Sequence, residues 1–202
     1  LDKEMKVIRP AILWSDTRTS AQCQKIYEKA GGLKELIGYV SNPALEGFTA
    51  PKILWLKENE PDNFAKVNLI LLPKDYIRYK LTGEIHMDVS DGAGTLMMNV
   101  EKKDWSDGLL EKIGLSRNIL PPLVDSINVT GHITERVSNK TGLMVGTPVV
   151  AGGADNACGA VGSGIIKEGR VMASIGTSGV VVAYAPKPVA DKQGRIHLFN
   201  HS

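Results

Sequence analysis

An apolar run that leads into a single acidic residue constrains this chain more than any other feature. Residues 149–164 read VVAGGADNACGAVGSG, in which Asp155 is the one acidic side chain among small and apolar neighbours. The run TPVVAGG before it predicts a buried strand, and the segment after it predicts a helix. In folds that mix strands and helices, ligands bind where a strand ends and a helix begins. We therefore expect Asp155 to lie at a binding site.

Asp155 has two interpretations, which are compatible. A helix N-terminus favours an ionised carboxylate, which can accept a proton from a substrate hydroxyl or help to hold a metal. Asp is also a preferred N-cap residue, with no chemistry implied. The glycines at positions 159, 162 and 164 each cost about 0.8–1 kcal/mol in a helix interior. They indicate either the close approach of a ligand or another backbone, or tight packing of the helix on a strand.

The rest of the chain mixes strand and helix patterns, which predicts an α/β or α+β fold. The patterns predict strands at residues 8–14, 68–72, 147–153, 170–175 and 180–184, the last two as a hairpin joined by GTSG. They predict helices at residues 19–30, 49–60 and 73–83, and a fourth that starts at Asp104 or Ser106 and ends at Gly114, several of them closed by glycine. They predict loops at residues 42–48 and 88–95, and irregular structure with short strands over residues 116–147.

Charge and cysteine usage exclude several classes of protein. The net charge is +2 and the basic residues are scattered, which argues against a nucleic-acid partner. Cys23 and Cys158 lie far apart, without the spacing of a zinc site or a disulfide framework, and favour a reducing cytoplasm. No apolar run approaches the roughly 20 residues that cross a bilayer, so we expect no membrane partner.

Two short stretches are further candidates for ligand binding. GTSG, residues 176–179, offers backbone amides and the hydroxyls of Thr177 and Ser178 to a phosphate, or is an ordinary hairpin turn. WSDTR, residues 14–18, combines the Trp14 ring with Asp16, which suits a sugar, or is a core tryptophan followed by a helix-capping acid. The chain lacks GxxxxGK[ST] and GxGxxG, so neither a P-loop nor a Rossmann site is indicated.

Seven stretches, taken together and in order, resemble the FGGY family of carbohydrate kinases. They are ILWSDTR, GFTAPKILWLKENEP, LLPKDYIRYKLTGE, SDGAGT, DWS, VVAGGADNACGAVGSG and SIGTSGV. GFTAPK with LLPKDY is most similar to the branch of that family that phosphorylates D-xylulose. The resemblance implies ribonuclease-H-like lobes, of the actin and hexokinase type, with the active site in the cleft between them. Residues 1–168 would be the later part of the first lobe, and residues 169–202 the first hairpin of the second.

The resemblance also implies roles for individual residues. The family transfers phosphate from ATP, with Mg²⁺, to a sugar hydroxyl, and Asp155 matches its catalytic base. Asn156 matches a residue that binds the sugar. Trp14, Asp16 and Phe48 match segments that wall and close the sugar pocket. Gly176, Thr177 and Ser178 match the turn that contacts the ATP phosphates.

The chain also departs from the family pattern. The family's first phosphate hairpin, a Met-His pair that contacts the sugar, and most of the second lobe are absent, so we expect a fragment of such a kinase that is inactive alone. We expect an exposed strand edge beside residues 149–150 to favour self-association, as a homodimer or otherwise. The alternatives are a gluconate, ribulose or glycerol kinase of the same family, or a non-catalytic sugar-binding regulatory module.

Overall fold

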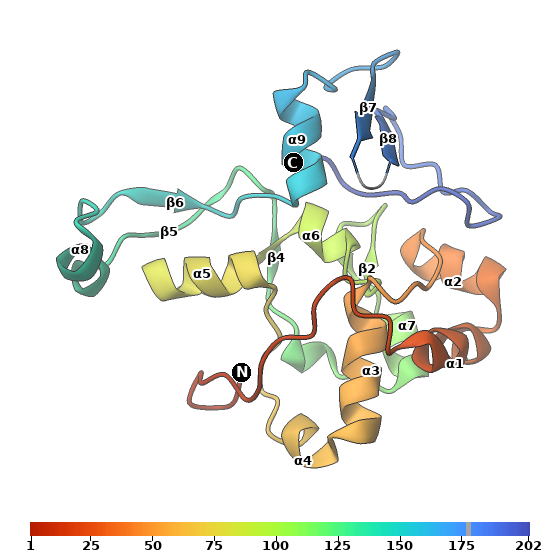
Figure 1. Cartoon of the computed structure of the whole chain (residues 1–202), viewed down its shortest axis with the longest axis horizontal. Coiled ribbons are helices and arrows are strands. Elements are labelled where there is room, and N and C mark those ends of the chain that lie inside the picture. The colour runs from red at the N-terminus through yellow and green to blue at the C-terminus, as the bar shows by residue number, and fades with distance from the viewer. Residues whose placement is uncertain (177–178) are drawn as a thin grey trace.

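The chain folds into a mixed α/β structure, for which a computed structural model describes residues 1–176 and 179–202 (Figure 1). The helices are α1 (Ser20–Ala30), α2 (Leu33–Val40), α3 (Thr49–Asn59), α4 (Pro61–Phe64), α5 (Pro73–Thr82), α6 (Val89–Ala93), α7 (Asp107–Ile113), α8 (Glu135–Thr141) and α9 (Asp155–Gly162), with a 3₁₀ turn at Arg117–Ile119. The strands are β1 (Met87–Asp88), β2 (Met98–Asn99), β3 (Asp104–Trp105), β4 (Leu123–Val124), β5 (Val129–His132), β6 (Pro148–Val150), β7 (Val171–Ile175) and β8 (Gly179–Ala183).

The hydrophobic core lies among the helices on one side of the molecule, where α1, α2, α3 and α7 meet (Figure 1). Ile26, Leu36, Leu109 and Ile113 are completely buried there. Each such side chain contributes about 1.5–3 kcal/mol through removal of its apolar surface from water. The core therefore lies among these four helices, and the candidate site is built by the other elements, α5, α6 and α9.

The strands pair two by two among the residues that the structure describes. β1 and β4 are parallel, and β5 and β6 form an antiparallel arm that projects from the body and carries α8 between them (Figure 1). β7 and β8 are antiparallel, with Ile175 opposite Gly179, which confirms the predicted hairpin. Within the described part of the chain, no helix has the length and apolar character needed to span a lipid bilayer.

The predicted helices with clear end signals are confirmed. α1 stops at Gly31, whose φ of 98° is in the left-handed region that glycine adopts without strain. α5 begins with Pro73 in its first turn and ends before Gly83, and α7 ends before Gly114. Residues 42–48 lie outside helices and strands, as predicted.

The strands predicted at residues 8–14 and 68–72 are wrong. The first segment is largely exposed and has no ladder, and Pro10 has no N–H to donate to one. In the second, Ile70 N donates to Ile119 O at 2.8 Å as an isolated bond rather than as part of a ladder. An apolar run becomes a strand only where another segment pairs with it, and that pairing is decided far away in the sequence.

Two helices also replace segments predicted to lack them. The loop predicted at residues 88–95 is wrong, because the Asp88 side chain accepts from the backbone of Ser90 and Asp91 and begins α6. Thr134 caps α8 in the same way, by accepting from Val137 N, within the region predicted to be irregular. α2, which is only eight residues long, was not among the predicted helices.

Candidate active site

Asp155 is the first residue of α9 and its side chain is exposed. Ala154 occupies the N-cap position, so the interpretation of Asp155 as the N-cap residue is wrong. Asp155 Oδ1 accepts a hydrogen bond from Asn156 N at 2.7 Å, within the first turn. The neighbouring Asn156 is exposed as well. The structure thus presents a carboxylate and an amide together at the solvent-facing start of a helix.

Gly152 and Gly153 allow the backbone conformation of the segment that leads to Asp155. Gly152 has a φ of +75°, which L side chains rarely adopt. A Cβ on Gly153 would meet the side chains of Ser202 and Cys158, so the Ser202 side chain would have to move to make room for it.

The glycines inside α9 differ from those before it. A Cβ on Gly159 or Gly162 would meet no atom within 4 Å, so tight packing within the described residues does not explain them. The approach of a ligand or of another backbone to α9 stays a prediction.

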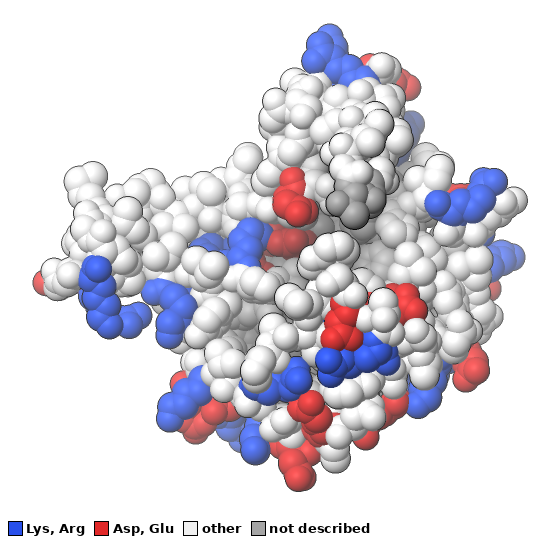
Figure 2. All heavy atoms as spheres, in the orientation of Figure 1, with Lys and Arg blue, Asp and Glu red and all other residues white. Residues whose placement is uncertain are grey.

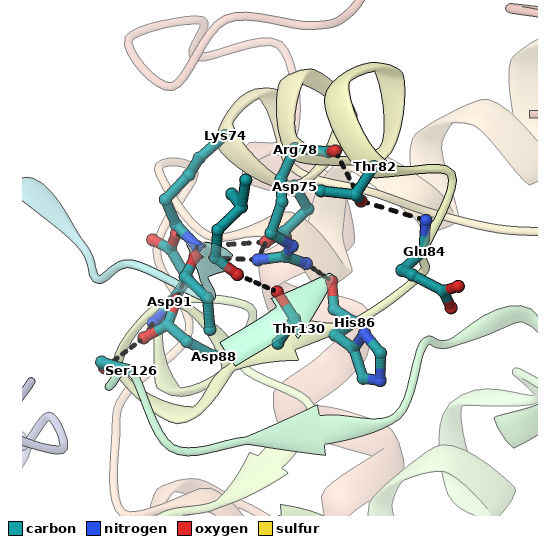
Figure 3. A network of polar contacts seen from close by, with 12 residues as sticks. Lys74, Asp75, Arg78, Thr82, Glu84, His86, Asp88, Asp91, Ser126 and Thr130 are labelled. Carbon is teal, nitrogen blue, oxygen red and sulfur yellow. Dashed lines mark hydrogen bonds and ion pairs between the residues drawn. The ribbon is translucent and has the colours of Figure 1, made fainter. Parts of the chain in front are cut away.

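A cluster of charged side chains from α5, α6 and the end of β1 contacts the segment that leads to Asp155, and Figure 3 shows its members. We call it the α5–α6 cluster; its members are Lys74, Asp75, Arg78, Asp88 and Asp91. Lys74 Nζ lies 3.0 Å from Asp75 Oδ1, 2.8 Å from Asp88 Oδ1 and 3.3 Å from Asp91 Oδ2. The Asp75 and Asp88 side chains are fully buried. One partly exposed lysine thus contacts three carboxylates, two of which are fully buried.

The α5–α6 cluster holds the chain just before Asp155. Ala151 O accepts hydrogen bonds from Arg78 Nη1 at 2.8 Å and from Lys74 Nζ at 3.2 Å. Arg78 Nη2 also donates to His86 O, which ties α5 to the start of β1. The cluster residues lie in LLPKDYIRYKLTGE and DVSDGAGT, but sequence reasoning gave them no role. The only signal was the alternation of charges over residues 74–78, which a solvated helix face shows equally.

Burial and charge affect the acids of this cluster in opposite directions. Burial opposes the charge of Asp88, but hydrogen bonds from Lys74, Ser90 and Ser126 outweigh burial and lower its pKa. Burial raises the pKa of Asp91 to about 6, with a further contribution from the Asp88 and Asp75 charges against the attraction of Lys74. Asp88 is therefore the ionised anchor of the cluster, whereas Asp91 resists ionisation in the folded state.

We expect Asp91→Asn to stabilise the protein above pH 6. A raised carboxyl pKa means that the folded state binds the proton more tightly than the unfolded state. Stability is therefore lost as the pH rises from about 4 to about 6. Asparagine removes that loss, which is worth up to about 3 kcal/mol at pH 7.5. Urea unfolding of the wild type and of Asp91→Asn at pH 5 and pH 7.5 measures the difference in their free energies of unfolding. A difference no larger at pH 7.5 than at pH 5 would contradict the expectation.

Of the residues predicted to wall a sugar pocket, Trp14 lies beside the loop that ends at Phe48. The Trp14 side chain is 80% exposed, so its interpretation as a core residue is wrong. A Cβ on Gly47 would lie 3.7 Å from Trp14 O, which places Trp14 beside the loop that ends at Phe48. Asp16 does not cap a helix. The Arg18 guanidinium bonds both of its oxygens and lowers the Asp16 pKa to about 2.

The C-terminal segment connects this region with α9. Phe48 is 5% exposed because its ring packs on His197 and Phe199, at centroid distances of 5.5 and 6.3 Å. Farther along, Ser202 lies against Gly153, and His201 Nε2 lies 3.2 Å from Ile165 O.

The predicted phosphate turn follows β7. Gly176 is exposed at the end of that strand, and Thr177 and Ser178 lie outside the described residues. Figure 2 shows acidic side chains at the lower end of α9 and an adjoining group of acidic and basic side chains over α5 and α6. Within residues 1–176 and 179–202, no three His, Cys, Asp or Glu side chains are grouped to hold a metal ion.

Known proteins match this chain along its whole length. A xylulose kinase of Bacillus subtilis (strain 168) is 49% identical over 201 residues, which are 100% of this chain and 40% of that protein. The crystal structure of a xyloylose kinase from Brucella ovis is 37% identical with a TM-score of 0.92, and the match covers 100% of this chain and 41% of that one. A gluconate kinase structure from Lactobacillus acidophilus, 22% identical over 100% of this chain and 41% of that one, also has a TM-score of 0.92, which shows the fold alone.

These matches agree with the architecture described above. The predicted α/β fold of the actin and hexokinase type is confirmed by the likeness to kinases of known structure over the whole chain. The chain spans about 40% of the length of the curated relatives it matches. Residues 1–162 match the N-terminal domain of the FGGY family of carbohydrate kinases. Because that match covers most of the chain, including Asp155 at the start of α9, this chain belongs to the FGGY family of carbohydrate kinases.

Proposed function

We propose that the protein to which this chain belongs transfers the γ-phosphoryl group of ATP to the terminal hydroxyl of D-xylulose. The observation that carries the proposal is Asp155, an exposed carboxylate at the start of α9 whose preceding segment is held by a buried polar cluster. Relatives that are 41–49% identical over this chain are xylulose kinases, which supports D-xylulose as the sugar. Since the chain spans about 40% of their length, the proposal concerns the whole enzyme.

In this proposal, Asp155 is the general base. It orients the sugar hydroxyl and accepts its proton while the oxygen attacks phosphorus. Asn156, next to it, donates to or accepts from a sugar hydroxyl. Catalysis of phosphoryl transfer depends mainly on positioning and charge neutralisation, so a precisely held carboxylate is the feature that such a site needs most.

The other predicted residues take supporting roles in the proposal. The exposed Trp14 ring offers a flat apolar face to the sugar. Asp16, already bound to Arg18, presents an ion pair rather than a free acid. Phe48 closes the pocket from the loop before α3. Gly176, Thr177 and Ser178 contact the phosphates of MgATP, the substrate in which the phosphate oxygens hold the Mg²⁺.

The remaining expectations stay proposals. We place residues 1–168 in the first lobe and residues 169–202 at the start of the second. We also place the enzyme in the cytoplasm, in keeping with its two unpaired cysteines. Self-association, as a homodimer or otherwise, stays a prediction, and sugar and MgATP are the partners proposed.

The test is a comparison of sugars with the whole enzyme. We expect kcat/KM for D-xylulose to exceed the values for D-ribulose, gluconate and glycerol by at least about tenfold. Buried polar groups that match one pattern of hydroxyls are left unpaired by another. Coupled measurement of ADP release with each sugar gives the answer. A preference for another sugar would move the enzyme to another branch of the family, and no turnover with any of them would favour a sugar-binding module.

A further inference from the structure

A buried hydroxyl connects the α5–α6 cluster with the residue that precedes Asp155. Ala154 N donates to Ser90 Oγ at 2.9 Å, and Ser90 Oγ in turn donates to Asp88 Oδ2. The direction of these bonds is fixed, because a backbone amide only donates, an ionised carboxylate only accepts, and a serine hydroxyl does both. Ser90 is 1% exposed and Asp88 is fully buried, so water does not compete for either group.

The segment that ends at Ala154 is also held at its start, at Ala151 and Gly152. Ala151 O accepts from Arg78 and Lys74, and Gly152 N donates to Ser126 O at 3.0 Å. Among the described contacts, the Ser90 hydroxyl is thus the last one that holds this segment before the chain enters α9. Because Asp155 directly follows Ala154, the Ser90 bond sets the position of the first turn that carries the carboxylate.

We propose that Ser90, held by Asp88, is a positioning residue for Asp155 in phosphoryl transfer. The proposal rests on the function proposed above for its assignment of Asp155 as the base. A displacement of about 1 Å at a reacting group costs about 10²-fold in rate, because the reacting atoms must stay close and aligned. Loss of the Ser90 hydroxyl frees the N-terminus of α9 to move, whereas the sugar contacts from the loop before α3 remain.

The chain offers a matched control for Ser90. Ser126 Oγ also donates to Asp88 Oδ2, at 3.0 Å, and Ser126 is 6% exposed. Its side chain makes no hydrogen bond to residues 151–154 among the described contacts, and its backbone carbonyl is kept in an alanine variant. Ser90→Ala and Ser126→Ala therefore remove the same kind of bond from the same carboxylate, but only the first removes the link to Ala154.

The experiment measures both variants in the whole enzyme with D-xylulose and MgATP. We expect Ser90→Ala to lower kcat about 10–100-fold with the KM for D-xylulose changed less than about threefold. For Ser126→Ala we expect both constants within about threefold of wild type. Ser90→Ala should lower Tm more than Ser126→Ala does, because it also leaves the Ala154 amide without its hydrogen bond. Ser90→Thr, which restores the hydroxyl, should recover most of kcat. Equal kcat for the two alanine variants would overturn the proposal.

A second readout does not depend on activity. Amide hydrogen exchange at Ala154, followed in the whole enzyme by mass spectrometry of peptides that span residues 151–156, should be at least about tenfold faster in Ser90→Ala and unchanged in Ser126→Ala. Unchanged exchange in Ser90→Ala overturns the positioning role, even if the wild type phosphorylates no sugar and the proposed function fails. Should Ser90→Ala not fold, Ser90→Cys keeps a similar side-chain volume but is a weaker donor and acceptor. Faster exchange at Ala154 in Ser90→Cys would then support the positioning role, and unchanged exchange would overturn it.

Discussion

Asp155→Asn is expected to abolish turnover by the whole enzyme, with kcat lower by about 10²–10⁴-fold or more. Asparagine has nearly the same shape as aspartate, but its amide does not accept a proton from the sugar hydroxyl. Asp155 is exposed and its Oδ1 accepts only from Asn156 N among the described contacts, so an amide oxygen can keep that bond. Sugar binding should remain largely intact. Steady-state kinetics with D-xylulose, together with calorimetry of sugar binding, measure the two effects separately.

Glu135→Gln is the matched control for this experiment. Glu135 is an exposed acid in the first turn of α8, so its substitution changes a charge at a helix N-terminus as Asp155→Asn does. Both variants should lose less than about 1 kcal/mol of stability through the helix dipole. Only Asp155→Asn should lose activity. A kcat near that of wild type in Asp155→Asn would contradict the assignment of Asp155 as the base.

Asp88→Ala is expected to cost about 3–5 kcal/mol in the free energy of unfolding, because it breaks a buried ion pair at one partner. Asp88 is fully buried and accepts hydrogen bonds from Lys74, Ser90 and Ser126. Its side chain also accepts from two backbone amides at the start of α6, so the helix loses its N-cap. Urea unfolding followed by circular dichroism measures the loss.

Asp125→Ala provides the comparison. Asp125 follows β4, the strand that pairs with β1, and forms an ion pair with Lys103 at 3.1 Å in which both side chains are more than half exposed. Exposed pairs of this kind contribute less than about 1 kcal/mol, because water and salt screen them. A loss in Asp88→Ala as small as that in Asp125→Ala would show that the cluster is not the anchor that its burial indicates.

The fold alone does not distinguish one sugar from another in this family. The gluconate kinase structure and the Brucella ovis structure have the same TM-score of 0.92 against this chain. Specificity therefore depends on individual side chains in the pocket rather than on the arrangement of helices and strands. This is why the proposed choice of D-xylulose rests on the sequence relatives and needs the comparison of sugars described above.

Some features of this protein were determined by local sequence. The ends of α1 and α5 are set by Gly31 and Gly83, because glycine alone adopts the left-handed conformation there without strain. The β7–β8 hairpin follows from two apolar runs that the sequence GTSG separates. The position of Asp155 at the start of α9 follows from an apolar strand, two glycines and a helical segment in succession. Each of these signals lies within a few residues of the structure it sets.

What only the tertiary structure decided depends on contacts between distant residues. Residues 8–14 and 68–72 have the composition of strands, but neither acquires a ladder, since ladder bonds need a second segment. Asp88 and Lys74 could each have been a solvated surface charge, and their burial against one another became visible only in three dimensions. Ser90 and Ala154 are 64 residues apart, and their hydrogen bond exists because the fold brings α6 against the segment before α9. The local sequence therefore determines where Asp155 lies along the chain. The packing of α5 and α6 determines which side chains hold the segment before it.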